Sequence, residues 1–166
     1  MESEIYELIC QILRRNDSLI EIAIKQRAKF EGWLKFELAN ELKKRYDDTR
    51  VEKKVNRSLV DVFANNSLIE LKTPNTNYAI TGVDKTKSRP ITKNIKDIED
   101  DIDKLKKNRS GFTNRYIAFV MFPVDSTDYQ KHINCVVSHL EKGTPICHGH
   151  VIINQFKTYV FVAKVF

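Results

Sequence analysis

The sequence predicts an α/β protein, because strand-like segments and amphipathic helical segments follow one another along the chain. Aliphatic and β-branched residues flank the pair Asn65-Asn66, which predicts two strands joined by a tight turn. Apolar residues recur at intervals of three or four in 28–46 and in 92–107, which is the period of a helix with one buried face. The nearly continuous apolar run within 115–122 is typical of a central strand.

The other elements follow from the same periodicities and from the turn residues between them. In the first half we expect two N-terminal helices before residue 28, a helix over 28–46, and strands over 51–55, 58–64 and 67–73. In the second half we expect a polar connection over 74–91, a helix over 92–107, a strand over 115–122, a helix over 127–141, and strands over 146–154 and 157–166.

The two N-terminal helices leave one question open. The first carries an apolar stripe that consists of Ile5, Leu8, Ile9, Ile12 and Leu13. The segment from Ser18 to Glu21 reads as a capping box for the second helix. The stripe has two interpretations, which are burial against its own domain and the isologous interface of a two-fold homodimer.

The hairpin brings charged residues together. With Asn65-Asn66 as the turn, Asp61 lies directly opposite Glu70, and Lys72 shares a face with Glu70. A slip of one residue in the register would move Asp61 to the other face. Because like charges paired across strands repel, a compensating cation is expected, and a divalent ion with oxygen ligands suits this role.

Glu31 is a further carboxylate, in the helix expected over 28–46. At helical periodicity it falls within an apolar stripe close to the line of Leu38 and Leu42. A carboxylate there is costly to bury without a partner. It has two interpretations: it complements the helix dipole and reaches solvent, or it faces a metal site at the edge of the core.

This arrangement of a helical Glu31, Asp61 on one strand and Glu70-Leu71-Lys72 on the next resembles the PD-(D/E)XK nuclease superfamily. Val60 stands where the proline of the name precedes the aspartate, a proline that members often lack. The resemblance implies a restriction-endonuclease-like core (αβββαβ) with a mixed central sheet flanked by helices. The core would span 28–122, with an N-terminal helical extension over 1–27 and a C-terminal helix and β pair over 123–166.

The resemblance also implies an activity, a metal-dependent nuclease that hydrolyses phosphodiester bonds, and we expect a DNA endonuclease. Asp61, Glu70 and the backbone carbonyl of Leu71 would bind Mg²⁺, with Mn²⁺ as a substitute. Glu31 would complete the outer side of this metal site. Lys72 would either position and deprotonate the attacking water or stabilise the transition state as a fixed cation.

The long connection after the hairpin is a candidate nucleic-acid contact. Lys85, Lys87 and Arg89 alternate within it and follow directly after the expected catalytic strand. Basic side chains in this position would reach a phosphate backbone. The alternative is a solvated surface loop whose basic residues contribute to solubility.

Composition narrows the class of protein. A chain of 166 residues with 42% hydrophobic residues suits one domain over 1–166, and a net charge of +6 suits a polyanionic partner. Three cysteines without paired spacing indicate reduced thiols and a cytoplasmic protein. The acidic start lacks a continuous apolar run, so neither a signal peptide nor a membrane span is expected.

Other interpretations of the charged and metal-binding residue types stay open. The acidic run within 92–107 favours a solvated helix face over a second metal site. The segment Cys147-His148-Gly149-His150 has poor spacing for zinc, because its cysteine and its histidines face opposite sides of a strand. A noncatalytic nucleic-acid-binding or protein-interaction module on the same fold is the alternative to an enzyme, and a surface charge ladder without any site is a third interpretation.

Overall fold

The computed structural model covers the chain, and it describes residues 1–55, 58–85, 89–107, 111, 114–125 and 127–166. The helices of this described part are α1 (Glu2–Arg15), α2 (Asp17–Gln26), α3 (Glu31–Lys43), α4 (Ile91–Lys107) and α5 (Tyr129–Ser138). Its strands are β1 (Arg50–Val55), β2 (Ser58–Ala64), β3 (Ser67–Lys72), β4 (Asn114–Met121), β5 (Ile146–Ile153) and β6 (Phe156–Lys164). The predicted α/β class is confirmed. None of the described helices has the length and apolar content needed to cross a membrane.

The strands form one mixed sheet in the order β1-β2-β3-β4-β6-β5. Strands β3 and β4 are parallel, whereas the other neighbouring pairs are antiparallel. A parallel pair requires a crossover connection, and α4 supplies it between β3 and β4. The helix therefore lies close to the hairpin that carries the predicted site residues.

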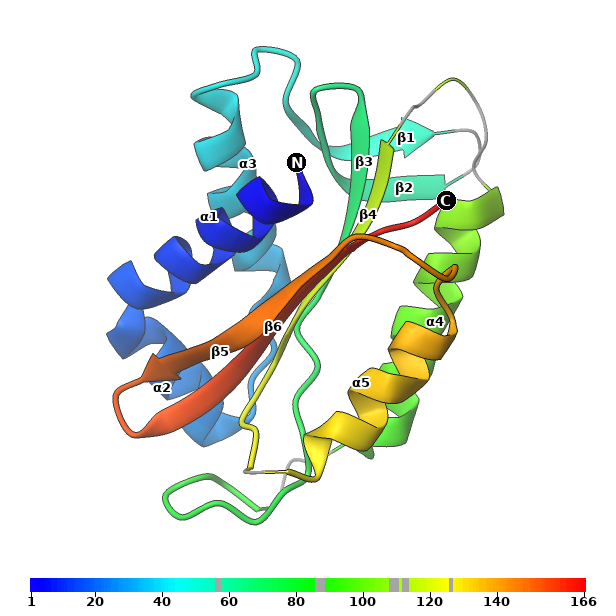
Figure 1. Cartoon of the computed structure of the whole chain (residues 1–166). Helices are drawn as coiled ribbons and strands as arrows, with labels where there is room; N and C mark the ends of the chain where they lie inside the picture. The colour runs from blue at the N-terminus through cyan, green and yellow to red at the C-terminus, as the bar shows by residue number, and fades with distance from the viewer. Residues whose placement is uncertain (56–57, 86–88, 108–110, 112–113, 126) are drawn as a thin grey trace.

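Helices cover both faces of the sheet. Figure 1 shows α1, α2 and α3 on one side and α4 and α5 on the other. Two hydrophobic cores correspond to these layers, one between the sheet and the first three helices and one between the sheet and the last two. From Tyr116 to Met121, β4 contributes alternate residues to the two cores, as expected for a strand that is buried on both faces.

The predicted hairpin has the expected turn and register. Val62 pairs with Ile69, and Ala64 pairs with Ser67. Asn65 and Asn66 have φ angles of 47° and 54°, which is the backbone that a two-residue primed turn requires. The identity of two turn residues was therefore sufficient to predict the register.

The N-terminal stripe packs inside the chain. Ile5, Leu8, Ile9, Ile12 and Leu13 are at most 3% exposed and belong to the core between α1 and the sheet. The alternative of a dimer interface made by this stripe is therefore wrong. The helix α1 packs against β5, β6 and α3, so its apolar face is removed from water within the chain.

Two predicted helix starts are also wrong. The second helix begins at Asp17 after Asn16, so Ser18 lies inside its first turn and is not a cap. The helix expected from residue 28 begins at Glu31. Arg27 ends α2 in the left-handed conformation, with φ of 49°, and this reverses the chain before α3 can start.

Arg27 also anchors the connection that follows β3. Its buried guanidinium donates hydrogen bonds to the carbonyl oxygens of Thr76, Tyr78 and Asp84, the last two at 2.6 Å. The side-chain amide of Asn75 donates to the Arg27 carbonyl at 2.8 Å. Buried polar groups need such partners, so the start of the connection is held against the α2–α3 junction.

Candidate functional site

The candidate site lies where β2 and β3 separate. The last backbone pair before the strands separate is Val62 with Ile69, and the pairing does not continue to Asp61 and Glu70. Instead, the backbone N–H of Leu71 donates a hydrogen bond to Oδ2 of Asp61 at 2.9 Å. The aspartate side chain thus takes the place of a strand partner. The prediction that Asp61 pairs directly with Glu70 is therefore wrong, because Asp61 contacts the backbone of the next residue of β3 instead. The negative charge of Asp61 still acts on Glu70.

Glu70 is the most deeply buried carboxylate of the site, with 2% exposure. Nζ of Lys104, from α4, contacts its Oε1 and also donates to the carbonyl of Leu59 at 2.7 Å. Burial raises the pKa of Glu70 to about 8. Lys104 opposes this rise, whereas the negative charges of Asp61 and Asp101 add to it.

Lys72 is held between two carboxylates. Its Nζ lies 2.8 Å from Oδ2 of Asp101 and 3.6 Å from Oε1 of Glu31. Burial lowers the pKa of Lys72, but the hydrogen bond with Asp101 and the charges of Asp101, Glu31 and Asp61 outweigh burial, so the pKa is raised. Lys72 is therefore a fixed cation at neutral pH, and this arrangement favours charge stabilisation over proton acceptance.

Glu31 faces this polar region, and its side chain is 29% exposed. It is the first residue of α3, and its Oε2 accepts a hydrogen bond from the Thr73 N–H at 3.3 Å. The Thr73 hydroxyl in turn accepts from the N–H of Phe30 at 3.3 Å. Burial raises the pKa of Glu31, the positive charge of Lys72 lowers it, and the charge of Asp61 raises it further. The start of α3 is thereby joined to the end of β3.

Lys35 belongs to the same site. Its Nζ lies 2.8 Å from Oε1 of Glu52 and 3.6 Å from Oδ1 of Asp61. Glu52 has a φ of 52° and interrupts the pairing of β1 with β2 opposite Asp61. Positive φ in a residue with a side chain is uncommon and strained. The strained residue here is Glu52, and it lies beside Asp61, a predicted metal ligand.

We define the carboxylate–lysine cluster as Glu31, Lys35, Asp61, Glu70, Lys72, Asp101 and Lys104. The structure thus brings together the four residues that the sequence indicated, and it adds Lys35, Asp101 and Lys104. The sequence contains a weak signal for these three. Lys35 follows Glu31 by four positions and Lys104 follows Asp101 by three, and such pairs share one helix face. The expectation that the acidic run of α4 is only a solvated face is wrong for Asp101.

The donor types of the cluster suit a hard cation, because carboxylate and carbonyl oxygens are the usual protein ligands of Mg²⁺. Within the described residues, however, no three His, Cys, Asp or Glu side chains are arranged around one point for a metal ion. Lys104 contacts Glu70 and the Leu71 N–H contacts Asp61. The ligand types therefore fit Mg²⁺, and Lys104 would have to move away from Glu70 for the ion to bind.

The structure describes two of the three basic residues of the long connection, and these two differ in their contacts. Lys85 is exposed. Arg89 pairs with Asp97 on α4, with Nη2 donating to Oδ1 at 3.1 Å, and it also contacts Asn94 at 3.5 Å. Lys87 lies outside the described residues. A nucleic-acid contact by these three residues stays a prediction.

Comparisons of this chain with known protein families, with curated proteins and with solved structures found no match.

Proposed function

We propose that this chain is a metal-dependent nuclease that hydrolyses phosphodiester bonds, with DNA as the substrate. One observation carries the proposal. Glu70 is a buried carboxylate whose pKa is raised to about 8, and the carboxylates of Asp61 and Asp101 add to that rise. Such a group costs stability, and strongly perturbed carboxylates flanked by other charges are concentrated at functional sites.

The order of elements supports the same proposal. The helix α3, the strands β1, β2 and β3, the crossover helix α4 and the strand β4 follow the αβββαβ order of a restriction-endonuclease-like core. Asp61 lies on β2, the Glu70-Leu71-Lys72 tripeptide lies on β3, and Glu31 starts α3. We propose that the fold belongs to this type.

In this proposal Asp61, Glu70 and the Leu71 carbonyl hold Mg²⁺, and Glu31 completes the outer side of the site. When bound, the ion supplies a Lewis acid and lowers the pKa of a bound water. The chain's own residues do the rest. Lys72, held as a cation, stabilises the negative charge that grows on the phosphate. Lys104, whose side chain is 32% exposed, would have to leave Glu70 for these residues to hold the ion.

A second function is favoured by the ion pairs themselves. Lys35, Lys72 and Lys104 pair with the carboxylates of Asp61, Asp101 and Glu70 and so balance their charge. Such neutralisation is also expected of a noncatalytic nucleic-acid-binding or protein-interaction module. The two functions differ in metal dependence, because binding by a module would persist in EDTA whereas cleavage by a nuclease would stop.

The test is cleavage of duplex DNA, single-stranded DNA, four-way junctions and RNA with Mg²⁺ or Mn²⁺. We expect cleavage by the full chain and none by Glu70→Gln or Lys72→Ala. Asp100→Asn is the matched control, because Asp100 lies on α4 beside the cluster with a side chain that is 61% exposed. Absence of cleavage on all of these substrates, or cleavage that survives in Glu70→Gln, would overturn the proposal.

A further inference from the structure

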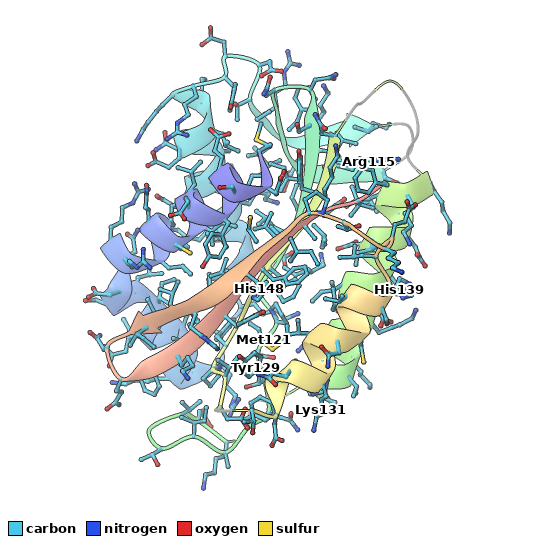
Figure 2. All side chains as sticks on the ribbon, viewed as in Figure 1. Arg115, Met121, Tyr129, Lys131, His139 and His148 are labelled. Carbon is cyan, nitrogen blue, oxygen red and sulfur yellow. The ribbon has the colours of Figure 1, made fainter. Side chains whose placement is uncertain are left out.

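A groove of about 570 Å³ lies between α5 and the strands β5 and β6, and the carboxylate–lysine cluster contributes none of its lining. A volume of this size is typical of small-molecule sites. Figure 2 labels two of its residues, Tyr129 at the start of α5 and His148 on β5. The lining residues that carry the inference are Tyr129, Asn134, His148, His150, Tyr159 and Phe161.

Aromatic rings form the floor of this groove. The ring centroids of Tyr129 and Tyr159 are 5.0 Å apart, and His150 lies 5.3 Å from each of them. His148 lies parallel to Phe161 within 23°, at 6.5 Å. The tyrosines and the phenylalanine are buried, whereas both histidines are exposed. The buried rings hold the histidines in place, so the exposed rings of His148 and His150 would offer a planar ligand an ordered stacking surface.

The groove is uncharged. The described side chains that line it include no Asp, Glu, Lys or Arg. Burial lowers the pKa of His150, and the nearby Lys157 and His148 lower it further, so His150 is neutral at pH 7. Tyr159 keeps its proton, because burial raises its pKa to about 12. Neutral rings favour stacking on a planar group over ion pairing with a phosphate.

Polar groups lie along the rim. Gln130 and Asn134, both exposed on α5, present side-chain amides that donate and accept hydrogen bonds. The Tyr159 hydroxyl and Nδ1 of His148 are 2.8 Å apart, which holds the His148 ring in position. A flat, uncharged aromatic ligand with donors and acceptors on its edge matches these features. A nucleobase has this chemistry.

We propose that this groove binds an unpaired nucleobase of a nucleic-acid strand, an inference that rests on the proposed nuclease function for the source of the base. The groove would then hold a base that has left the duplex or belongs to a single strand, while the cluster acts on the backbone. Base stacking on aromatic side chains is tolerant of sequence, because every base presents a flat face.

The experiment measures binding of the full chain in EDTA, so that no cleavage is required. The probe is a short fluorescein-labelled deoxyadenosine strand, and its anisotropy is compared with that of an abasic strand with the same number of phosphates. We expect the base-bearing strand to bind more tightly. His148→Ala/His150→Ala should weaken this binding about fivefold or more, without changing the slope of log affinity against log salt.

Two further variants serve as controls. His139→Ala is the matched histidine control, since His139 ends α5 outside the groove and lies 3.4 Å from Asp103; its binding should equal that of the unmodified chain. Asn134→Trp fills the groove from the exposed face of α5 and should weaken binding as the double variant does. Circular dichroism confirms that all of the variants are folded.

Equal affinity for the base-bearing and abasic strands would overturn the inference. So would a double variant with unchanged affinity, or one whose salt slope falls, because the histidines would then contact phosphate. Displacement by deoxyadenosine monophosphate at concentrations as low as those of the strand would assign the groove to a free nucleotide and overturn the strand assignment. These binding results do not depend on cleavage. A chain that does not cleave would therefore contradict the proposed nuclease function without contradicting base binding in the groove.

Discussion

Lys104 on α4 donates a hydrogen bond to Oε1 of Glu70 on β3, so the crossover helix supplies the counter-charge for the most buried carboxylate of the cluster. The two residues are 34 positions apart in the sequence. A charge-assisted hydrogen bond at a buried carboxylate is stronger than a neutral one. In the proposed nuclease it would also compete with the metal ion for Glu70.

Removing this competitor should therefore strengthen metal binding. In Lys104→Met we expect the affinity for Mn²⁺ to rise about tenfold. The reason is that the ion no longer has to break a charge-assisted hydrogen bond worth roughly 1.5 kcal/mol. Isothermal titration calorimetry measures the change. Because Lys104 lowers the pKa of Glu70, the titrations of both chains are repeated in buffers of different ionisation enthalpy, so that the proton released by Glu70 is counted separately. Lys107→Met, on the exposed last turn of the same helix, should leave the affinity unchanged. Weaker binding in Lys104→Met would show that Lys104 supports the site and does not compete for it.

The raised pKa of Glu70 predicts a pH-dependent stability. Glu70 is protonated in both the folded and the unfolded chain below its ordinary pKa of 4.5, and its stabilising contribution is fully present there. That contribution is lost as the pH rises from 4.5 to about 8, because over this range the unfolded chain releases the proton of Glu70 whereas the folded chain keeps it. Glu70→Gln stays neutral, so its melting temperature relative to the unmodified chain should rise between about pH 5 and pH 8.5.

Differential scanning calorimetry in EDTA measures this difference at the two pH values. If the unmodified chain instead gains stability over Glu70→Gln as the pH rises, the ion pair with Lys104 outweighs burial and Glu70 is ionised throughout this range.

Asp61→Asn should separate catalysis from stability. The variant keeps a side-chain oxygen that can accept the hydrogen bond from the Leu71 N–H, while it loses the charge that repels Glu70. We expect cleavage to be abolished and the melting temperature in metal-free buffer to be unchanged or slightly higher. Full activity in this variant would remove Asp61 from the list of metal ligands.

Glu31→Gln should be milder than Asp61→Asn, because Glu31 completes the outer side of the site. Its Oε2 accepts a hydrogen bond from Thr73, which the glutamine oxygen can replace. The ratio of the cleavage rates of the two variants is the measurement. A loss as complete as that in Asp61→Asn would make Glu31 a primary ligand.

The connection between β3 and α4 should contribute to DNA binding through its basic residues. If Lys85, Lys87 and Arg89 contact phosphates, replacing all three with alanine should reduce the salt slope of duplex binding by about 0.9 for each lost contact. Asp97→Asn releases Arg89 from its ion pair and should strengthen binding. Fluorescence anisotropy over a range of salt concentrations measures both effects, and unchanged slopes would mean that the connection is only a solvated loop.

The elements of this fold were predictable where the signal is local. The turn at Asn65-Asn66 requires a particular backbone, and this determines which residues of β2 and β3 are paired. The period of α4 and the apolar run of β4 depend on near neighbours in the sequence. Helix ends were less predictable. Arg27 ends α2 in a left-handed conformation although it is not glycine, because its side chain binds carbonyl groups about 50 residues further along the chain.

The sequence by itself determined the hairpin that places Asp61, Glu70 and Lys72 at one end of two strands, and it indicated Glu31. Only the tertiary structure decided which counter-charges these residues have. Lys35, Asp101 and Lys104 reach the cluster because α3 and α4 pack near the point where β2 and β3 separate. Periodicity within a segment shows which face of a helix is apolar, but it does not show which strand that helix will cover. Contacts between elements far apart in sequence are decided by packing of the whole chain.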